Sequence, residues 1–335
     1  MKKLFYRAGA LLLCLALLIT PSLAITTEDM AQAVQEVAEQ AIAECVDDSM
    51  TDLEKLTALH DWMCLHCEYG QSPNASYAYG GLVEGVGNCM GYARGYAALA
   101  AAAGLEGVAT YSYGMEHGWI LATLDGTRYF SDCTWDDGKK AKLGLIRHLY
   151  WLFDQSNAGD TNHYGWLSEE NVPGGILETA PWSAAMTRVI FSGDYCWYID
   201  ADMCLWRCDR DTWHTELLLD MSDIEWPYIS EEGGTPSGIY SGLILLDDRL
   251  IFNTPYEILS VDLEGGDGQV LLAPDTGDGV IYGIAVRDGT ICYSVATGPD
   301  DTLYEIVDTG LSAVGAWGYG WEDDISAPSD TGAGT

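Results

Sequence analysis

The chain has 335 residues and carries 51 Asp and Glu against 15 Lys and Arg, which gives a formal net charge of −36. Such a surface repels polyanions, and the sequence contains no cluster of basic residues that could neutralise phosphates. Nucleic acid and anionic membranes are therefore not expected as partners. Cationic substrates, including lysine-bearing amines, would be tolerated or favoured, although the same acidity can simply keep the protein in solution.

The first 24 residues have the three parts of a secretory signal peptide. A positive region, Met1–Arg7, precedes a short apolar stretch, Ala8–Ile19, and Pro21-Ser22-Leu23-Ala24 ends with small residues at the two positions that a signal peptidase reads. We expect cleavage after Ala24 and a secreted, extracellular mature chain. No later run approaches the ~20 apolar residues of a membrane span, so no membrane association is expected after signal removal.

Two helices are predicted next, over about Thr27–Cys45 and Thr51–Cys67. The second opens with the capping-box pattern Thr-x-x-Glu. Within it, His60, Cys64 and Cys67 recur at helical spacing and could ligate zinc. The same spacing fits the inner face of an amphipathic helix or a disulfide. Because no second pair of ligands follows at metal-binding spacing, we predict no metal and no cofactor.

A glycine-broken stretch that ends in Asn88 leads into an alanine-rich helix predicted over Cys89–Ala103, with Gly104 as its left-handed stop. Cys89 lies in the first turn, where unpaired N–H groups and the positive end of the helix dipole favour thiolate over thiol. The same N–H groups could bind an oxyanion. A cysteine at a helix start is more often a buried small hydrophobe than a nucleophile, so its partners decide between the two interpretations.

A β-hairpin supplies those partners. Two strand-like runs, residues 117–124 and 127–134, flank Asp125-Gly126, a strong signal for a type I′ turn. In that register Leu124 pairs with Thr127, and His117 and Asp132 become diagonal neighbours on one face, roughly 7–8 Å apart at the backbone. An imidazole and a carboxylate can span that separation with one hydrogen bond. Cys133 should point the other way, into the core.

These residues resemble the transglutaminase-like superfamily of papain-like cysteine enzymes. The resemblance covers about residues 50–165 and rests on Gly-Asn-Cys89-Met-Gly-Tyr, His117-Gly-Trp and Tyr-Phe-Ser-Asp132-Cys-Thr-Trp. It implies that Cys89 is the nucleophile, His117 the general base and acid, and Asp132 the group that orients the imidazole. Many relatives have alanine after the histidine where this chain has Gly118, a change that leaves these roles intact. If Cys89 is free, eight cysteines remain in the mature chain and could form disulfides, whose connectivity the sequence leaves open.

The resemblance and the helix pattern together predict an α+β catalytic domain over residues 25–175, with helices packed on an antiparallel sheet. Trp119 and Trp135 are expected in the core or in the site wall, and His148 and His163 as structural or rim residues. Residues 180–312 read as an all-β domain. Three units of strand, polar turn, strand, loop and strand recur there at a spacing close to that of propeller blades, and they fit an incomplete propeller, a sandwich or an assembly with a partner. Residues 313–335 are expected to form a disordered tail.

We therefore interpret the chain as an exported, cysteine-dependent acyl-transfer enzyme that acts on protein or peptide amides through a thioester. The resemblance leaves transfer to an amine acceptor, deamidation and peptide hydrolysis open. The alternative is a non-catalytic scaffold on the cell surface, whose β domain would contact cell-wall polymer or glycans through exposed aromatic side chains. An intact triad favours the enzyme, whereas a buried Cys89 would favour the scaffold.

Overall fold

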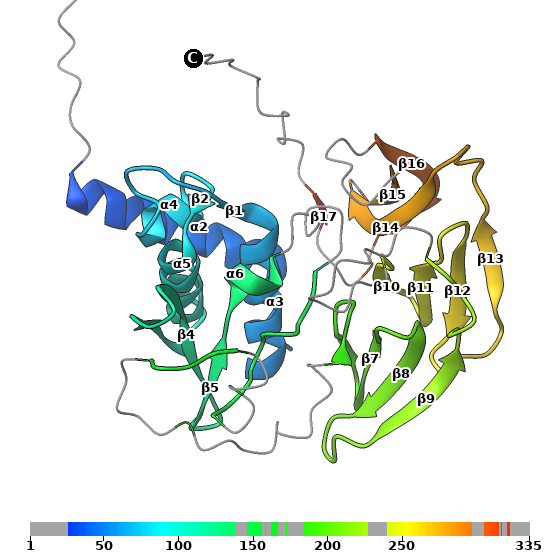
Figure 1. Cartoon of the computed structure of the whole chain (residues 1–335), viewed down its shortest axis with the longest axis horizontal. Coiled ribbons are helices and arrows are strands. Elements are labelled where there is room, and N and C mark those ends of the chain that lie inside the picture. Colours follow the sequence, from blue (N-terminus) through cyan, green and yellow to red (C-terminus); the bar gives the residue numbers. More distant parts are fainter. Residues whose placement is uncertain are drawn as a thin grey trace, which may run out of the picture.

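A computed structural model gives the structure of most of the chain (Figure 1). The predicted signal peptide, residues 1–24, lies outside the described residues. No helix in the described part of the chain is long and apolar enough to cross a membrane. The described residues are 26–137, 146–155, 158, 162–166, 172, 184–226, 240–287, 289–296, 305–314, 316 and 320–321.

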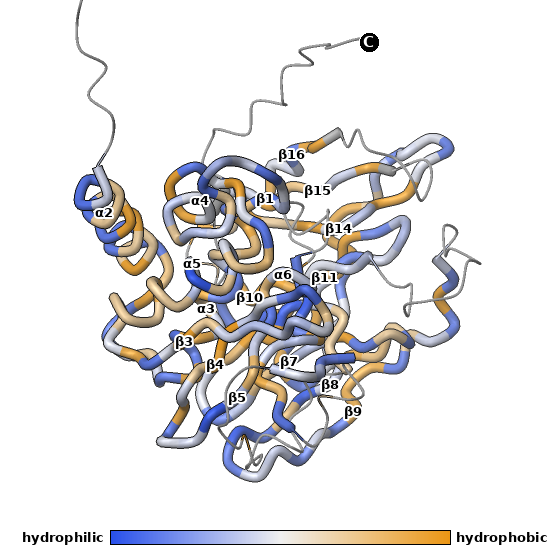
Figure 2. The backbone as a smooth tube through the Cα atoms, turned by 60° about the vertical axis from the view of Figure 1, so that its left-hand side comes forward, coloured by the Kyte–Doolittle hydropathy of each residue, from blue (hydrophilic) through white to orange (hydrophobic). Residues whose placement is uncertain are grey.

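The first two described helices begin at capping boxes, because a threonine side chain and an acidic side chain three residues later satisfy each other's backbone N–H groups. These helices are α2 (Thr27–Cys45) and α3 (Asp52–His66), so Cys67 is the C-terminal cap of α3 and not part of it. In Figure 2, hydrophilic and hydrophobic positions alternate along α2, as expected for an amphipathic helix. In contrast, α3 is buried along most of its length.

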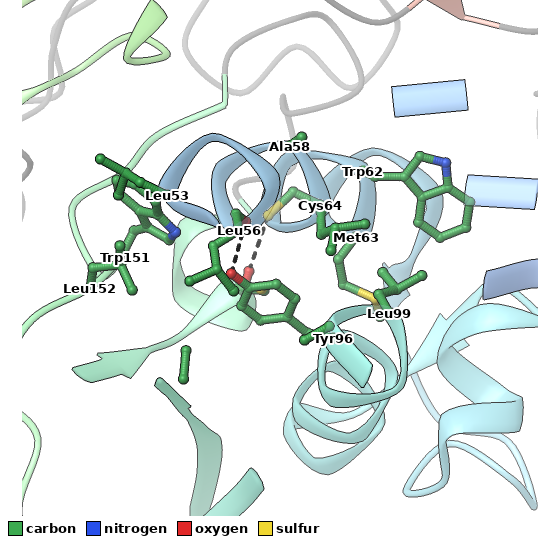
Figure 3. Close-up of a cluster of buried hydrophobic side chains, with 14 of the residues drawn as sticks. Leu53, Leu56, Ala58, Trp62, Met63, Cys64, Tyr96, Leu99, Trp151 and Leu152 are labelled. Carbon is green, nitrogen blue, oxygen red and sulfur yellow. Dashed lines mark hydrogen bonds between the residues drawn. The ribbon is translucent and has the colours of Figure 1, made fainter. Parts of the chain in front are cut away.

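The predicted nucleophile helix is α5 (Cys89–Ala102), and Gly104 follows it with a φ of 78°, which confirms the expected stop. Figure 3 shows part of the core between α3 and α5, where Cys64 and Met63 of α3 lie near Tyr96 and Leu99 of α5. The short elements before α5 are β1 (Glu68–Tyr69), α4 (Ala78–Leu82) and β2 (Val86–Gly87), and β1 pairs with β2 in parallel.

An antiparallel sheet follows in the order β3-β4-β5. Asp125 and Gly126 both have positive φ, as a type I′ turn requires, and Leu124 pairs with Thr127 as predicted. Alternate side chains of the central strand enter two cores, so Ile120 belongs to the core shared with α3 and α5 and Trp119 to the core on the opposite face. The strands are β3 (Glu106–Ser112), β4 (His117–Leu124) and β5 (Thr127–Ser131).

The prediction of a strand through residue 134 is wrong. After β5 ends at Ser131, the chain turns into the short helix α6 (Cys133–Asp136). The pairing of β4 with β5 therefore stops at Ile120 and Ser131 and does not extend to His117. The physical reason is the side chain of Asp132, which caps α6. Its Oδ1 accepts hydrogen bonds from the N–H groups of Thr134 and Trp135. Its own N–H donates to the carbonyl of Tyr150.

The C-terminal half consists of strands in three sheets, in the orders β6-β7-β8-β9, β10-β11-β12-β13 and β16-β15-β14-β17. Each of the three predicted units supplies three neighbouring antiparallel strands, and each sheet gains one strand more, which pairs in parallel in the last sheet. Within the described residues these sheets close into neither a barrel nor a propeller. The strands are β6 (Ile190–Ser192), β7 (Tyr195–Ile199), β8 (Cys204–Asp209), β9 (Thr215–Asp220), β10 (Leu243–Leu246), β11 (Arg249–Asn253), β12 (Ile258–Asp262), β13 (Gln269–Leu272), β14 (Val280–Arg287), β15 (Thr290–Ala296), β16 (Glu305–Ser312) and β17 (Gly320–Trp321).

The strand β17 falls within the stretch that the sequence predicts to be disordered, while residues 322–335 lie outside the described residues. Among the aromatic residues of this half whose burial the structure describes, most are core residues: Trp197, Phe252 and Tyr282 are buried, whereas Tyr195 and Tyr256 are exposed. Core packing therefore accounts for most of these described aromatic side chains.

The helical half and the strand half share buried contacts. Nε of Arg188, just before β6, lies 3.0 Å from Oδ2 of Asp61 on α3, and both side chains are buried. Nη1 of Arg210, after β8, lies 3.0 Å from Oε1 of Glu54 at the start of α3. Apolar side chains of β6 and β7 also belong to the same core as those of α3. The helix α3 is thus the element on which the two halves meet.

Candidate active site

Cys89 is the first residue of α5, and the cap residue Asn88 fixes where that helix begins. The side-chain oxygen of Asn88 accepts hydrogen bonds from the N–H groups of Met90 and Gly91, at 3.0 and 3.2 Å, and its amide donates to Ser76 Oγ at 2.6 Å. This cap holds the sulfur of Cys89 at the positive end of the helix dipole. Cys89 is 8% exposed.

The cap also changes one expectation from the sequence. Because Asn88 occupies the N–H groups of Met90 and Gly91, these two donors are not available to an oxyanion as the sequence predicts for the first turn. The Met90 N–H additionally faces the sulfur of Cys89. An oxyanion near Cys89 would have to use other donors.

His117 and Asp132 meet although they are not strand neighbours. Nε2 of His117 lies 2.6 Å from Oδ2 of Asp132, and both residues are buried, with exposures of 8% and 1%. The predicted single hydrogen bond between imidazole and carboxylate is present. Its geometry arises from the cap of α6, because Oδ1 of Asp132 binds backbone N–H groups and leaves Oδ2 for His117. Since Nε2 is engaged in this way, Nδ1 is the ring nitrogen left to face Cys89.

The interactions among the three residues favour a thiolate beside an imidazolium. Burial alone would raise the pKa of the Cys89 thiol, but a hydrogen bond and the charge of His117, with the N–H groups of Gly118 and Met90, lower it below its usual value. Burial alone would lower the pKa of His117, but its hydrogen bonds to Asp132 and Cys89 raise it to about 9. Burial likewise opposes ionisation of Asp132, and hydrogen bonds from His117 and His163 outweigh it and lower the pKa of that carboxyl.

Aromatic rings enclose the imidazole of His117. The ring of Trp135 stacks on it with centroids 4.9 Å apart and an interplanar angle of 19°. The ring of Trp119 lies 5.9 Å from it between centroids, at an interplanar angle of 32°. Trp119 is 1% exposed and belongs to the core. Trp135 is therefore a wall of the site and Trp119 a core residue, which agrees with the two environments predicted for them.

His163 is a neighbour of this site that the sequence places among structural or rim residues. It is 1% exposed, and its Nε2 lies 3.1 Å from Oδ2 of Asp132, the oxygen that also binds His117. The rim position is wrong, because the residue is buried. No local pattern connects His163 to Asp132 in the sequence, since 31 residues separate them. His148 is also buried, and it contacts Asp61 and the N–H of Val189, away from Cys89.

Gly118 fits a space that alanine could not occupy without a shift. A Cβ at this position would lie 2.3 Å from Sδ of Met90 and 3.0 Å from the carbonyl oxygen of Thr110. The departure from the alanine of many relatives is therefore matched by the long side chain of Met90, which fills the place of that methyl group.

Three groups of side chains in the described part of the chain bear on metal binding. The predicted set of His60, Cys64 and Cys67 does not come together, because Cys67 caps α3 and its sulfur points toward the carbonyl of Glu68. Instead, Cys133 joins His60 and Cys64. Ligand atoms of His60, Asp61 and His148 also lie within 4.8 Å of one another, as do those of His117, Asp132 and His163 in the candidate active site.

The described cysteines include one pair that faces across a sheet. Cys196 of β7 and Cys208 of β8 are direct partners in an antiparallel register, and both are buried. All nine cysteines of the described chain are thiols in this structure. Disulfide formation among them stays a prediction.

Comparison with protein-family models gives a match over part of the chain. Residues 39–135 match the family model described as the transglutaminase-like superfamily, and the match includes Cys89, His117 and Asp132. Residues 39–135 are therefore a transglutaminase-like domain. Among curated proteins, none matches this sequence.

Several solved structures are similar at low identity. A candidate cysteine protease from Cytophaga hutchinsonii is 18% identical with a TM-score of 0.26, over 34% of this chain and 44% of that one. A protein described as a TGase is 14% identical with a TM-score of 0.27, over 39% of this chain and 38% of its own. PorZ, a surface component of the type-IX secretion system of Porphyromonas gingivalis, is 14% identical with a TM-score of 0.24, over 66% of this chain and 22% of its own. This chain covers less than half the length of each, and at such TM-scores the likeness assigns no substrate.

Proposed function

We propose that this protein is a cysteine-dependent acyl-transfer enzyme in which Cys89 is the nucleophile, His117 the general base and acid, and Asp132 the orienting carboxylate. The observation that carries the proposal is the position of His117, which is hydrogen-bonded to Asp132 at 2.6 Å and interacts through its ring with the thiol of Cys89. A nucleophile, a base and a group that orients the base are the parts of a catalytic triad.

The reaction would take place in two steps. In the first, the Cys89 thiolate attacks an amide carbonyl, a C–S bond forms, and the C–N bond breaks as His117 gives its proton to the leaving amine. In the second, water or another amine attacks the thioester, His117 accepts its proton, and the thiolate leaves. The N–H of Cys89 itself is a first-turn donor that the Asn88 cap does not take up, and we assign it to the oxyanion.

The substrate class follows from the same family and from the charge of the chain. Transglutaminase-like enzymes act on protein or peptide amides, so the acyl donor would be a glutamine side chain or a peptide bond. A formal charge of −36 favours a cationic acceptor such as a lysine amine over an anionic one. The signal-peptide pattern of residues 1–24 supports an activity outside the cell, and we assign glycan contact to the exposed tyrosines of the strand half.

Selective alkylation tests the nucleophile. Purified protein is treated with iodoacetamide near pH 6, and labelled peptides are mapped by mass spectrometry. We expect Cys89 to react first, because its pKa is lowered while burial raises the pKa of Cys64 and Cys133. The reaction should slow in His117→Ala and stay unchanged in His66→Ala, a histidine that stacks on Trp62 outside the site.

Product analysis then separates the reactions. A glutamine-containing peptide is incubated with a fluorescent primary amine, and products are identified by mass. Incorporation of the amine indicates transfer, conversion of glutamine to glutamate indicates deamidation, and shorter peptides indicate hydrolysis. Each product should disappear in Cys89→Ala, which removes only the sulfur.

The low exposure of Cys89, 8%, is the one observation that favours the non-catalytic scaffold. A scaffold predicts that Cys89 is alkylated no faster than Cys64, and that no peptide substrate is turned over. Rapid labelling of Cys89 at pH 6 would rule out the scaffold, and absent labelling would rule out the enzyme.

A further inference from the structure

A second cluster of chemically active side chains is buried outside the candidate active site. Nε2 of His60 and the sulfurs of Cys64 and Cys133 lie within 4.8 Å of one another, and Nε2 of His60 is 3.9 Å from the sulfur of Cys64. The exposures of the three residues are 0%, 0% and 3%. His60 and Cys64 are one turn apart on α3, and Cys133 is the first residue of α6. Figure 3 shows Cys64 among the core side chains of α3.

A carboxylate lies next to this set of three, on the same ring nitrogen of His60. Oδ2 of Asp136 lies 3.2 Å from Nε2 of His60, and the side chain of Asp136 is fully buried. Asp136 follows Cys133 by three residues on α6, so one short helix supplies a sulfur and an oxygen toward α3. One imidazole, two thiols and one carboxylate are a combination that suits a four-coordinate zinc ion. Two sulfur ligands disfavour calcium and magnesium, which prefer oxygen.

The surroundings of His60 match those of a metal-bound histidine. Its second ring nitrogen, Nδ1, lies 3.1 Å from Oδ1 of Asp61, and a buried carboxylate in this position fixes the ring and its tautomer. Asp61 is itself held by Nε2 of His148 at 2.8 Å and by Nε of Arg188 at 3.0 Å. The backbone N–H of Tyr150 donates to both oxygens of Asp136, at 3.1 Å each, which orients that carboxylate as well.

We propose that His60, Cys64 and Cys133, with Asp136 drawn in from its hydrogen bond to His60 as the fourth ligand, form a structural zinc site that joins α3 to α6. The site fits a structural role because its four side chains are buried and leave no open position for substrate. Cys133 directly follows Asp132, so a metal on Cys133 would also fix the turn from which Asp132 reaches His117. The proposal does not depend on the thioester chemistry, because the zinc would bind whether or not Cys89 is a nucleophile.

Metal analysis of the purified full chain tests the site. The protein is expressed in zinc-supplemented medium, purified under reducing conditions and dialysed. Its metal content is then measured by inductively coupled plasma mass spectrometry. We expect about one zinc ion per chain. The zinc should be lost in Cys64→Ser and in Cys133→Ser. Two matched variants should keep it: Cys67→Ser, which alters a buried cysteine at the end of the same helix, and Cys89→Ser, which alters the candidate nucleophile.

Cobalt substitution of the wild-type chain provides a second measurement, and this one does not require that a variant folds. Co²⁺ bound by thiolates absorbs in the near ultraviolet, and a four-coordinate Co²⁺ ion has intense visible bands. The wild-type chain reconstituted with Co²⁺ should show both, and Asp136→Asn should alter the visible bands while the sulfur absorption remains. Asp61→Asn, which removes the carboxylate behind His60, should weaken zinc affinity about 10- to 100-fold.

Three results would overturn the proposal. The first is a wild-type chain that holds no zinc after incubation with zinc and dialysis. His60 and its neighbours would then be a hydrogen-bonded network without a metal. Peptide mapping of the chain purified without reductant could show Cys64 joined to Cys133 in a disulfide, with the intact mass lower by two hydrogen atoms. Zinc could also be retained in Cys64→Ser and lost in His117→Ala, which would move the metal to the candidate active site. A failure of catalysis with zinc still bound would reject only the proposed function.

Discussion

Nε2 of the buried His163 lies 3.1 Å from Oδ2 of Asp132, the same oxygen that binds His117. We infer that His163 positions Asp132 and thereby holds the imidazole of His117. In that role His163→Ala should lower kcat/KM by about 10-fold, well below the loss of about 10⁴-fold expected from the loss of the orienting carboxylate in Asp132→Asn.

The pH dependence of kcat/KM separates this role from a merely structural one. His163→Ala removes a hydrogen-bond donor to Asp132, the carboxylate that stabilises the imidazolium of His117. The basic limb of the profile should therefore move in His163→Ala and return toward its wild-type position in His163→Gln. An unchanged profile together with a lower melting temperature would mean that His163 only fills space.

Activity should depend on pH as expected for a thiolate and imidazolium pair. The pKa of Cys89 is lowered and that of His117 is raised to about 9, so the pair is populated between these two values. We expect kcat/KM to rise as the thiol ionises, to level off, and to fall as His117 loses its proton near pH 9. In Asp132→Asn the falling limb should shift to lower pH, because the charge that stabilises the imidazolium is gone. A wild-type profile that falls near pH 6.5 would contradict this assignment.

The same shift affects stability. The folded-state pKa of His117 is raised from 6.5 to about 9, so its contribution to the free energy of unfolding is fully present below pH 6.5 and is lost as the pH rises through about 9. Urea unfolding at several pH values should show this loss in the wild type and not in His117→Ala. If the free energy of unfolding depended on pH equally in both proteins, this would count against a raised pKa of His117.

Gly118→Ala should disturb the site through Met90. The new Cβ would lie 2.3 Å from Sδ of Met90, and such overpacking costs about 1–3 kcal/mol of the free energy of unfolding. The double variant Met90→Ala/Gly118→Ala should recover at least half of that loss, because the atom closest to the new Cβ belongs to the flexible side chain of Met90. Denaturant unfolding of the two single variants and the double variant gives the coupling energy. Strict additivity would show that the carbonyl of Thr110, at 3.0 Å, is the real obstacle.

Arg188→Met should destabilise the chain more than the loss of a surface ion pair. Arg188 and Asp61 are both buried and lie 3.0 Å apart, and removal of one partner from a buried pair costs about 3–5 kcal/mol. Glu264→Gln is the matched control, since Glu264 is 73% exposed where it meets Arg207, and its loss should cost less than about 1 kcal/mol. Urea unfolding followed by tryptophan fluorescence measures both. Similar losses in the two variants would show that the contact between the halves contributes little.

Features fixed by neighbours in the sequence could be predicted. The start of α5 at Cys89 follows from the cap residue Asn88 and the alanine-rich stretch behind it, and these interactions lie within one helical turn. The register of β4 and β5 follows from the turn at Asp125-Gly126, where only certain residues accept positive φ. From these two local features the sequence already brought Cys89, His117 and Asp132 into one candidate site.

Other features required the folded chain. The cap that turns Asp132 out of its strand competes with strand pairing, and the contact with Tyr150 that accompanies this turn lies far along the sequence. His163 reaches Asp132 across 31 residues, and Cys133 reaches Cys64 across 69. The sequence therefore determined which residues begin each local element and carry the chemistry. Only the tertiary structure decided which distant side chains share a carboxylate or a metal site, because spacing along a chain carries no information about contacts made after it folds back on itself.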